Sequence, residues 1–324
     1  MAESKTAPIP SSDYQPLIVS NPDGTYTRLL HFPSVPATPD PNTTTSPVLT
    51  KDIPINPTRQ TWLRIYLPRR ALHSSSGNKL PLVFYYHGGA FVFFSAASNL
   101  AHDFCLTMTA QLDAVVISVE YRLAPENRLP AAYEDAMEAL HCIKSSQENW
   151  LTEYTDLSNC FLMGSSAGGN IAYHAVLRAS EQVQKLDPLK IKGLVLHHPY
   201  FGGKERTGSE LKMAKDPILP LPGSDFMWEL SLPVGADRDH EYSNPMAGNW
   251  SRMCECIRGV GVRVLVTGCY GDPLIDRQME FAKLLEENEV GTVAHFTEGC
   301  HTVELVDSLK ADSLFLVIKK FMSD

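Results

Sequence analysis

The sequence predicts an α/β fold with a mostly parallel central sheet flanked by helices. Short apolar runs, typical of buried strands, alternate with longer amphipathic stretches, typical of helices. A chain of 324 residues with 44% hydrophobic residues can also bury one large core. We therefore expect residues 1–324 to form a single domain.

The first part of the chain differs in composition from the rest. Residues 1–50 are rich in Pro, Ser, Thr and Asp, which predicts a loop-rich arm. Residues 61–67 alternate between apolar and polar and predict an early antiparallel strand. We expect the arm to contribute to a cap over the functional site.

Strands and helices then follow in regular order. We expect strands at 81–86, 114–120, 160–164, 191–197, 262–268 and 292–296, and helices at 98–111, 130–146, 168–179 and 277–286. This β–α–β order requires a mostly parallel sheet covered on both faces. Residues 202–255 interrupt it with glycines, prolines and the apolar run 226–230. We interpret 202–255 as a cap insertion that contains a helix and loops.

A serine lies in the turn between a predicted strand and a predicted helix. Residues 164–168 read Gly-Ser-Ser-Ala-Gly, and G-x-S-x-G between strand and helix is the pattern of a nucleophile elbow. Its sharp turn lifts the hydroxyl of the central serine clear of the sheet. The pattern by itself is weak, because a chain with 20 glycines can match it by chance. Together with the motifs below, it predicts Ser166 as a nucleophile.

A glycine turn after an earlier predicted strand suggests an anion-binding loop. It reads His87-Gly88-Gly89-Ala90. We expect the backbone N–H groups of Gly88, Gly89 and Ala167 to form an oxyanion hole, in which each donor contributes about 3 kcal/mol. His87 is expected to support this loop by hydrogen bonding rather than to act as a base.

A serine nucleophile needs a base and an acid that orients the base. In this strand–turn–helix context they follow the serine in the order Asp or Glu, then His. Asp272 and His301 each lie on a loop directly after a predicted strand, so both can converge on Ser166 at one sheet edge. Asp276 begins an amphipathic helix, where an acid interacts favourably with the helix dipole. His295 lies inside a predicted strand and is expected to be a packed or surface residue.

Three further side chains are candidates for the substrate pocket. His198 follows a predicted strand and precedes Asp272 in the chain, so, like His197, it fits a pocket wall better than the role of base. Phe91 and Phe93 follow the oxyanion loop. We weigh a pocket wall and core packing about equally for these two residues.

Charge and composition exclude several classes of partner. The net charge is −9, with 28 basic and 37 acidic residues and no dense basic block, so we expect neither nucleic acid nor an anionic membrane as a partner. No dinucleotide-binding or Walker motif is present. The expected partner is a small-molecule ester, without a cofactor.

The cysteines and the N-terminal sequence bear on metal binding and location. Seven cysteines lack the paired C-x-x-C spacing of zinc sites. We therefore expect free thiols and no metal. The N-terminal residues contain no apolar signal segment, and no run reaches the ~18 apolar residues of a membrane span. We expect a soluble cytoplasmic protein, either a monomer or a dimer.

Five short motifs are distributed over most of the chain. They are His87-Gly88-Gly89, residues 120–126 (EYRLAPE), 166–170 (SAGGN), 235–240 (GADRDH) and 272–276 (DPLID). With these motifs the sequence resembles, over most of its length, the plant carboxylesterases of the hormone-sensitive-lipase-like branch of the α/β-hydrolases. The resemblance implies the α/β-hydrolase fold with a helical cap. It also implies Ser166, Asp272 and His301 as a catalytic triad and Gly88, Gly89 and Ala167 as the oxyanion hole.

Three positions depart from the pattern of this family. Ala90 stands where a third glycine is usual, which suits a negative φ angle and is awkward at a positive one. Ser165 replaces a residue that is usually acidic, and Cys300 precedes His301 where tyrosine is common. No member of the triad is lost.

The sequence thus predicts a metal-free carboxylesterase that hydrolyses small-acyl, acetyl-like esters through an acyl-enzyme. Two alternatives stay open. The gibberellin receptors resemble this family but have lost the catalytic histidine, so the presence of His301 counts against such a ligand-binding role. Some relatives convert acetylated alkaloid intermediates by elimination and cyclisation, and Ser165 and Ala90 leave room for that chemistry.

Overall fold

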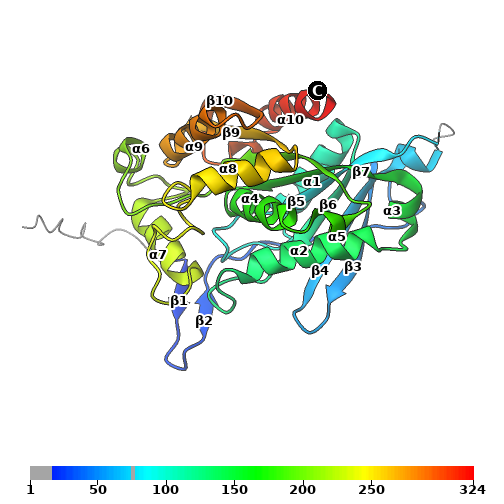
Figure 1. Ribbon diagram of the computed structural model, residues 1–324. Helices are drawn as coiled ribbons and strands as arrows, with labels where there is room; N and C mark the ends of the chain where they lie inside the picture. Colours follow the sequence, from blue (N-terminus) through cyan, green and yellow to red (C-terminus); the bar gives the residue numbers. More distant parts are fainter. Residues whose placement is uncertain (1–16, 74–76) are drawn as a thin grey trace, which may run out of the picture.

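The computed structural model describes residues 17–73 and 77–324. Its centre is an eight-stranded sheet with the strand order β10-β9-β8-β7-β5-β6-β4-β3 (Figure 1). The strands are β3 (Val48–Asn56), β4 (Thr61–Pro68), β5 (Leu80–Tyr86), β6 (Val115–Glu120), β7 (Thr155–Ser165), β8 (Ile191–His197), β9 (Arg263–Gly271) and β10 (Thr292–Cys300). Strands β10 to β6 are parallel, and β4 is antiparallel to both of its neighbours. The predicted α/β fold with a mostly parallel sheet is confirmed.

Helices cover both faces of this sheet, as parallel strands require. The helices are α1 (Asn99–Leu112), α2 (Ala131–Lys144), α3 (Asn149–Tyr154), α4 (Ala167–Ser180), α5 (Val183–Leu186), α6 (Gly208–Lys212), α7 (Leu221–Ser231), α8 (Trp250–Gly259), α9 (Ile275–Glu287) and α10 (Ser308–Ser323). In β5, Leu82 and Phe84 pack in the core beneath α2 and α4, whereas Val83 and Tyr85 pack beneath α1 and α10. This alternation follows from the two-residue period of a strand.

Strand β3 was not predicted from the sequence. It pairs with β4 over nearly its whole length, with a register shift near Pro54, and forms one edge of the sheet. Proline is tolerated on an edge strand because its missing N–H does not interrupt a ladder. Pro54 and the charged residues Lys51 and Asp52 interrupt the apolar residues of this strand. A prediction based on hydrophobic runs therefore does not detect it.

The described part of the N-terminal arm packs against the inserted segment. Strands β1 (Ile18–Ser20) and β2 (Tyr26–Arg28) form a hairpin that lies beside α7 (Figure 1). The buried side chains between them are Ile18, Val92, Phe93, Ala124, Met227 and Leu230. The arm's residues 1–16 lie outside the described residues. From Trp250 onward, the tract expected as a cap belongs to α8, which packs against α4 in the helix layer.

Within residues 17–73 and 77–324, no helix has both the length and the apolar character that a membrane span requires.

Candidate active site

Ser166 lies on a strained turn at the carboxyl end of β7. Its backbone angles are φ 55° and ψ −119°, and α4 begins at the next residue. Two flanking glycines make the turn possible. A Cβ on Gly168 would lie 1.8 Å from the carbonyl oxygen of Tyr86, and a Cβ on Gly164 would lie 2.0 Å from the backbone of Gly168. Any side chain there would force the strand and the helix apart, which explains the residue pattern of the elbow.

The structure brings Ser166, Asp272 and His301 together. Asp272 follows β9 and His301 follows β10, at the same edge of the sheet as the end of β7. Nε2 of His301 lies 2.9 Å from Oγ of Ser166, and Nδ1 of His301 lies 2.7 Å from Oδ2 of Asp272. All three side chains are buried. The geometry suits transfer of the serine proton to the imidazole.

The carboxylate of Asp272 is fully occupied by hydrogen-bond donors. Besides His301, Oδ2 accepts hydrogen bonds from Nδ1 of His198 at 2.7 Å and from Nε2 of Gln278 at 2.9 Å. Oδ1 accepts the backbone N–H of Leu274 at 2.9 Å. Burial raises the pKa of Asp272, but the charges and hydrogen bonds of His301 and His198 outweigh it and hold the pKa below its ordinary value. Asp272 is thus an anion fixed in one orientation.

Asp276, the other acid weighed from the sequence, lies in the first turn of α9. Its carboxylate accepts the backbone N–H of Ser209 at 2.7 Å. It therefore joins α9 to α6 and does not contact His301.

The glycine turn lies directly against the serine. A Cβ on Gly88 would be 3.1 Å from the carbonyl oxygen of Ser165 and 3.3 Å from Cβ of Ser166. Gly89 has φ +98°, and a Cβ there would lie 2.3 Å from the carbonyl oxygen of Phe93. Only glycine allows the backbone to approach the nucleophile in this way.

His87 supports this turn. Nδ1 of His87 donates a hydrogen bond to the carbonyl of Gly88 at 2.9 Å, and the hydroxyl of Tyr121 donates to the carbonyl of His87 at 2.7 Å. The rings of His87 and Tyr121 stack, with centroids 4.3 Å apart. Burial lowers the pKa of His87 to about 4. The ring is therefore neutral near pH 7 and has a supporting role, while the contribution of Tyr121 was missed from the sequence.

Ala90 has a positive φ angle, which is unfavourable for a residue other than glycine. Its φ angle is 50°, and Phe91 and Phe94 also have positive φ angles of 64° and 71°. Non-glycine residues enter this left-handed region at a cost of about 1–2 kcal/mol. The hydroxyl of Ser231, in α7, donates to the carbonyl of Ala90 at 3.3 Å, so the cap helix helps to hold the strained turn.

A mostly apolar cavity of about 510 Å³ opens onto the serine. Its lining combines the arm, the glycine turn, the segment before and within α7, and the segment after β10. The lining includes the apolar side chains of Leu17, Leu30, Phe32, Phe93, Phe94, Ile218, Leu219, Met227, Val303, Leu305 and Val306 and, from the catalytic groups, Gly88, Gly89, Ser166 and His301. Such a cavity suits a small, largely apolar ligand.

The three candidate pocket residues, Phe91, Phe93 and His198, differ in whether they line this cavity. Phe93 lines the cavity. Phe91 does not, because its ring is buried against Tyr200 and Trp228, with centroids 6.2 and 5.5 Å away. His198 was also expected in the pocket wall, and this was wrong. Its ring is fully buried behind Asp272.

Ser165, where the family usually has an acidic residue, is fully buried beside the nucleophile. Its hydroxyl accepts a hydrogen bond from the hydroxyl of Tyr85 at 3.0 Å. Burial raises the pKa of Tyr85 well above its ordinary range. The neutral Ser–Tyr pair thus suits a position where an unpaired carboxylate would be unfavourable.

Two overlapping groups of side chains in the described residues are close enough to hold a metal ion. One is His198, Asp272 and His301. The other is His197, His198 and Glu304, which lies behind Asp272. Neither group was predicted from the sequence as a metal site, because its members are far apart in the chain and follow no spacing motif.

Comparisons with known proteins agree with this geometry. Residues 83–304 match the family model described as alpha/beta hydrolase fold. The chain is 50% identical to Carboxylesterase 20 of Arabidopsis thaliana, over 94% of each chain. It is 48% identical to the 3-O-acetylpapaveroxine carboxylesterase CXE2 of Papaver somniferum, over 93% of this chain and 95% of that one.

Among solved structures, the chain is similar to an esterase of Pyrobaculum calidifontis. The TM-score is 0.69 with 27% identity, and 84% of this chain and 85% of that one are covered. The thermostable carboxylesterase EstE1, cloned from a metagenomic library, has a TM-score of 0.71 with 26% identity, covering 87% and 91%.

Proposed function

The chain belongs to the α/β-hydrolase fold family, among the plant carboxylesterases, and we propose that this carboxylic ester hydrolase cleaves small-acyl esters through an acyl-enzyme on Ser166. The observation that carries the proposal is the unbroken chain of hydrogen-bonding contacts from Ser166 through His301 to Asp272.

In the proposed mechanism, Oγ of Ser166 attacks the ester carbonyl carbon while Nε2 of His301 takes the hydroxyl proton. Asp272 keeps the imidazole in the tautomer that has Nδ1 protonated and stabilises the imidazolium. The N–H groups of Gly88, Gly89 and Ala167 receive the negative oxygen of the tetrahedral intermediate. His301 then gives its proton to the departing alcohol.

Water completes the cycle by the same path. It loses a proton to His301 and attacks the acyl carbon, and the carboxylic acid leaves as Ser166 regains its proton. No step requires a group beyond the substrate, water and these residues.

Two observations favour a small acyl group. The bulky side chains of Phe93 and Phe94, which follow the glycine turn, line the same cavity as Ser166. The poppy relative is named for an O-acetyl ester. A larger, apolar alcohol part then fits the remainder of the cavity, between the arm and α7.

A ligand-binding role like that of the gibberellin receptors has less support. Such a role needs no base, yet His301 is present and bonded to both Ser166 and Asp272. No contact in the described residues specifically favours elimination and cyclisation over hydrolysis. We therefore retain hydrolysis as the proposed reaction.

The cysteines bear on where this reaction takes place. All seven are free thiols, and Cys105, Cys160 and Cys269 are fully buried. We propose a reducing compartment, the cytoplasm, as the site of action. Fractionation of the native tissue with an antibody to the protein tests this, and recovery in a secreted or organelle fraction would contradict it.

The test of the reaction compares p-nitrophenyl acetate, butyrate and octanoate as substrates. We expect wild-type turnover with preference for acetate, and a loss of at least about 10⁴-fold in kcat for Ser166→Ala and His301→Ala. His295→Gln serves as the control, because His295 lies within β10 and outside the triad. Circular dichroism checks that each variant is folded. A fluorophosphonate probe should label the wild type and not Ser166→Ala. Undiminished labelling of a folded Ser166→Ala would refute the assignment.

A further inference from the structure

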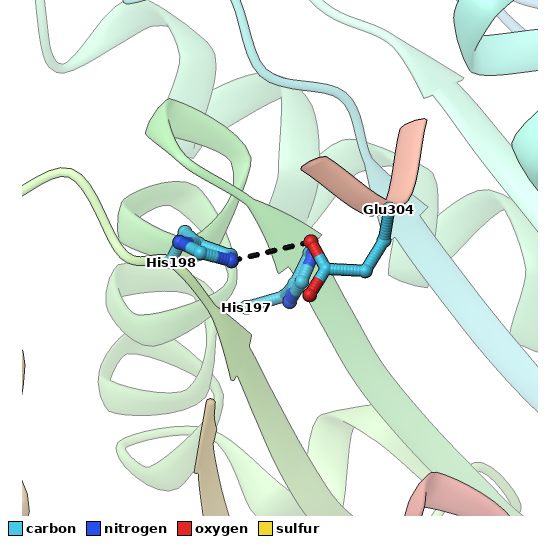
Figure 2. A group of neighbouring side chains, drawn as sticks. All are labelled: His197, His198 and Glu304. Carbon is cyan, nitrogen blue, oxygen red and sulfur yellow. Dashed lines mark ion pairs between the residues drawn. The ribbon is translucent and has the colours of Figure 1, made fainter. Parts of the chain in front are cut away.

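Three buried side chains meet next to Asp272. They are His197 at the end of β8, His198 next to it, and Glu304 in the short 3₁₀ helix at Val303–Leu305 (Figure 2). Nε2 of each histidine lies 3.3 Å from the same oxygen of Glu304, Oε2. The two histidines have no solvent exposure and Glu304 has 8%. The cluster is therefore shielded from water.

The close contacts among these three atoms are not well-aligned hydrogen bonds. Within the described residues, Nε2 of His197, Nε2 of His198 and Oε2 of Glu304 are buried and make no aligned hydrogen bond. The distances of 3.3 Å are short enough for hydrogen bonds. The angles are therefore what is unsuitable, because the ring nitrogens do not point along the line to the oxygen. Unpaired buried polar atoms are unfavourable, and three in one place call for a common partner.

The distances fit a tetrahedral metal ion. Zinc binds imidazole nitrogen and carboxylate oxygen at about 2.0–2.1 Å, so two ligand atoms in a tetrahedron lie about 3.3 Å apart. Both nitrogen–oxygen distances in the cluster have this value.

The other ring nitrogen of each histidine is already fixed. Nδ1 of His198 donates to Oδ2 of Asp272 at 2.7 Å, and Nδ1 of His197 lies 2.9 Å from Oγ1 of Thr267. Histidines that bind zinc usually donate their second N–H to a carboxylate or another oxygen in this way. With Nδ1 holding the proton, the lone pair of Nε2 is directed into the cluster.

A thiol and a small cavity adjoin the cluster. Sγ of Cys269 lies 3.8 Å from Oε1 of Glu304, and its side chain also interacts with His198. Of the three clustered residues, Glu304 also lines a cavity of about 60 Å³, together with Thr267, His295 and other side chains of β9, β10 and α10. The thiol faces the other carboxylate oxygen of Glu304 and is not part of the group of close ligand atoms. A water molecule would therefore complete the four positions of a zinc ion, and the cavity supplies the direction of entry.

We propose that His197, His198 and Glu304 bind a zinc ion, with a water molecule as the fourth ligand. The charges agree with this assignment, because a dication offsets the buried carboxylates of Glu304 and Asp272. Bound zinc would join the end of β8 to the segment after β10, next to the triad. This inference rests on the cluster itself and does not depend on the proposed esterase reaction. The alternative occupant of the site is a proton shared by the same atoms.

The test measures metal binding directly on the full-length protein after treatment with a chelator. Competition with a chromophoric chelator should give one zinc per chain, and Co²⁺ should give the visible bands of tetrahedral coordination. We expect Glu304→Gln and His197→Gln each to weaken zinc binding by at least about tenfold. His295→Gln, in the wall of the same small cavity, is the matched control and should bind zinc like the wild type.

Thermal unfolding gives a second readout, because a ligand of the folded state raises Tm. Zinc should raise Tm of the wild type and of His295→Gln but not that of Glu304→Gln. Absence of tetrahedral Co²⁺ bands in the wild type overturns the proposal, and so does undiminished binding in both ligand variants. Because substitution of a buried residue can disturb folding, the wild-type cobalt spectrum decides even where a variant does not fold.

Discussion

Nδ1 of His198 lies 2.7 Å from Oδ2 of Asp272, the same oxygen that accepts Nδ1 of His301 at 2.7 Å. One carboxylate oxygen thus receives imidazole N–H groups from two different histidines. The two rings meet nearly at right angles, with an interplanar angle of 83°. His198 therefore fixes the orientation of the acid that in turn orients His301.

Replacing His198 should slow the reaction without weakening substrate binding. A hydrogen bond to a charged group contributes about 1.5–3 kcal/mol, and Gln278 and the N–H of Leu274 continue to hold Asp272. We therefore expect His198→Gln to lower kcat about tenfold with KM unchanged. Steady-state kinetics in chelator-containing buffer measures this effect without metal, and His197→Gln is the control because His197 does not contact Asp272. Wild-type kcat in His198→Gln would show that this hydrogen bond does not position the triad.

Gly168→Ala should prevent a stable fold. Its new Cβ would lie 1.8 Å from the carbonyl oxygen of Tyr86, a backbone atom that cannot move aside. We expect the free energy of unfolding to fall by more than about 4 kcal/mol. Gly259→Ala is the matched control, because a Cβ on Gly259, within α8, meets no atom within 4 Å. Urea unfolding of both variants measures the difference, and equal stability would contradict the close packing of the elbow.

The folded protein should become less stable as the pH falls, because of a buried histidine. His174 in α4 stacks on Tyr133 at 4.2 Å, and burial, aided by the charge of Arg178, lowers its pKa to about 3. The unfolded chain binds this proton near pH 6.5 and the folded chain does not. The stability is therefore complete above about pH 6.5 and decreases between pH 6.5 and 3, by up to about 1.4 kcal/mol per pH unit. His87 adds a similar effect down to about pH 4.

The contribution of His174 can be isolated by His174→Phe, which keeps an aromatic ring but cannot bind a proton. Urea unfolding at several pH values between 4 and 8 should show a slope smaller by about one proton in this variant. The same slope in both proteins would mean that His174 is not neutral in the folded state.

Arg28 should control access to the cavity. Its guanidinium makes paired contacts of 2.8 and 2.6 Å with Glu126 and donates to the carbonyls of Val92 and Ala124 at 2.7 and 2.8 Å. It thereby ties the β1–β2 hairpin to the core. We expect Arg28→Ala to lower kcat/KM for apolar esters about tenfold, mainly through KM.

The control for Arg28 is Arg252→Ala. Arg252 forms an exposed pair with Glu181 at 3.3 Å, and such surface pairs contribute little. Kinetics with p-nitrophenyl butyrate should therefore match the wild type in Arg252→Ala. An unchanged KM in Arg28→Ala would show that the hairpin does not shape the substrate site.

The mostly parallel sheet and the convergence of Ser166, Asp272 and His301 were predictable because they follow from local patterns. Apolar runs mark strands, glycines mark tight turns, and loops at the ends of parallel strands meet at one edge. Asp272 was preferred to Asp276 because it directly follows a strand, whereas Asp276 begins a helix. Such signals are carried by neighbouring residues, so the sequence displays them directly.

Features that depend on packing between distant segments were not predictable. Phe91 and Phe93 have the same local sequence context, yet one enters the core and the other lines the cavity. His198 was placed in the pocket wall, because its position next to a strand end does not reveal which way the ring points. Glu304 gave no signal, because its partners lie about a hundred residues earlier in the chain.

The cavity takes most of its walls from segments outside the sheet, whereas Ser166, Asp272 and His301 lie at the ends of sheet strands. Residues such as Leu30 and Ile218 are anchored to the sheet only through the arm and the inserted segment. Substitutions there can accumulate during evolution with little effect on the sheet. Duplicated genes with this fold can in this way come to act on different substrates while they keep the same catalytic residues.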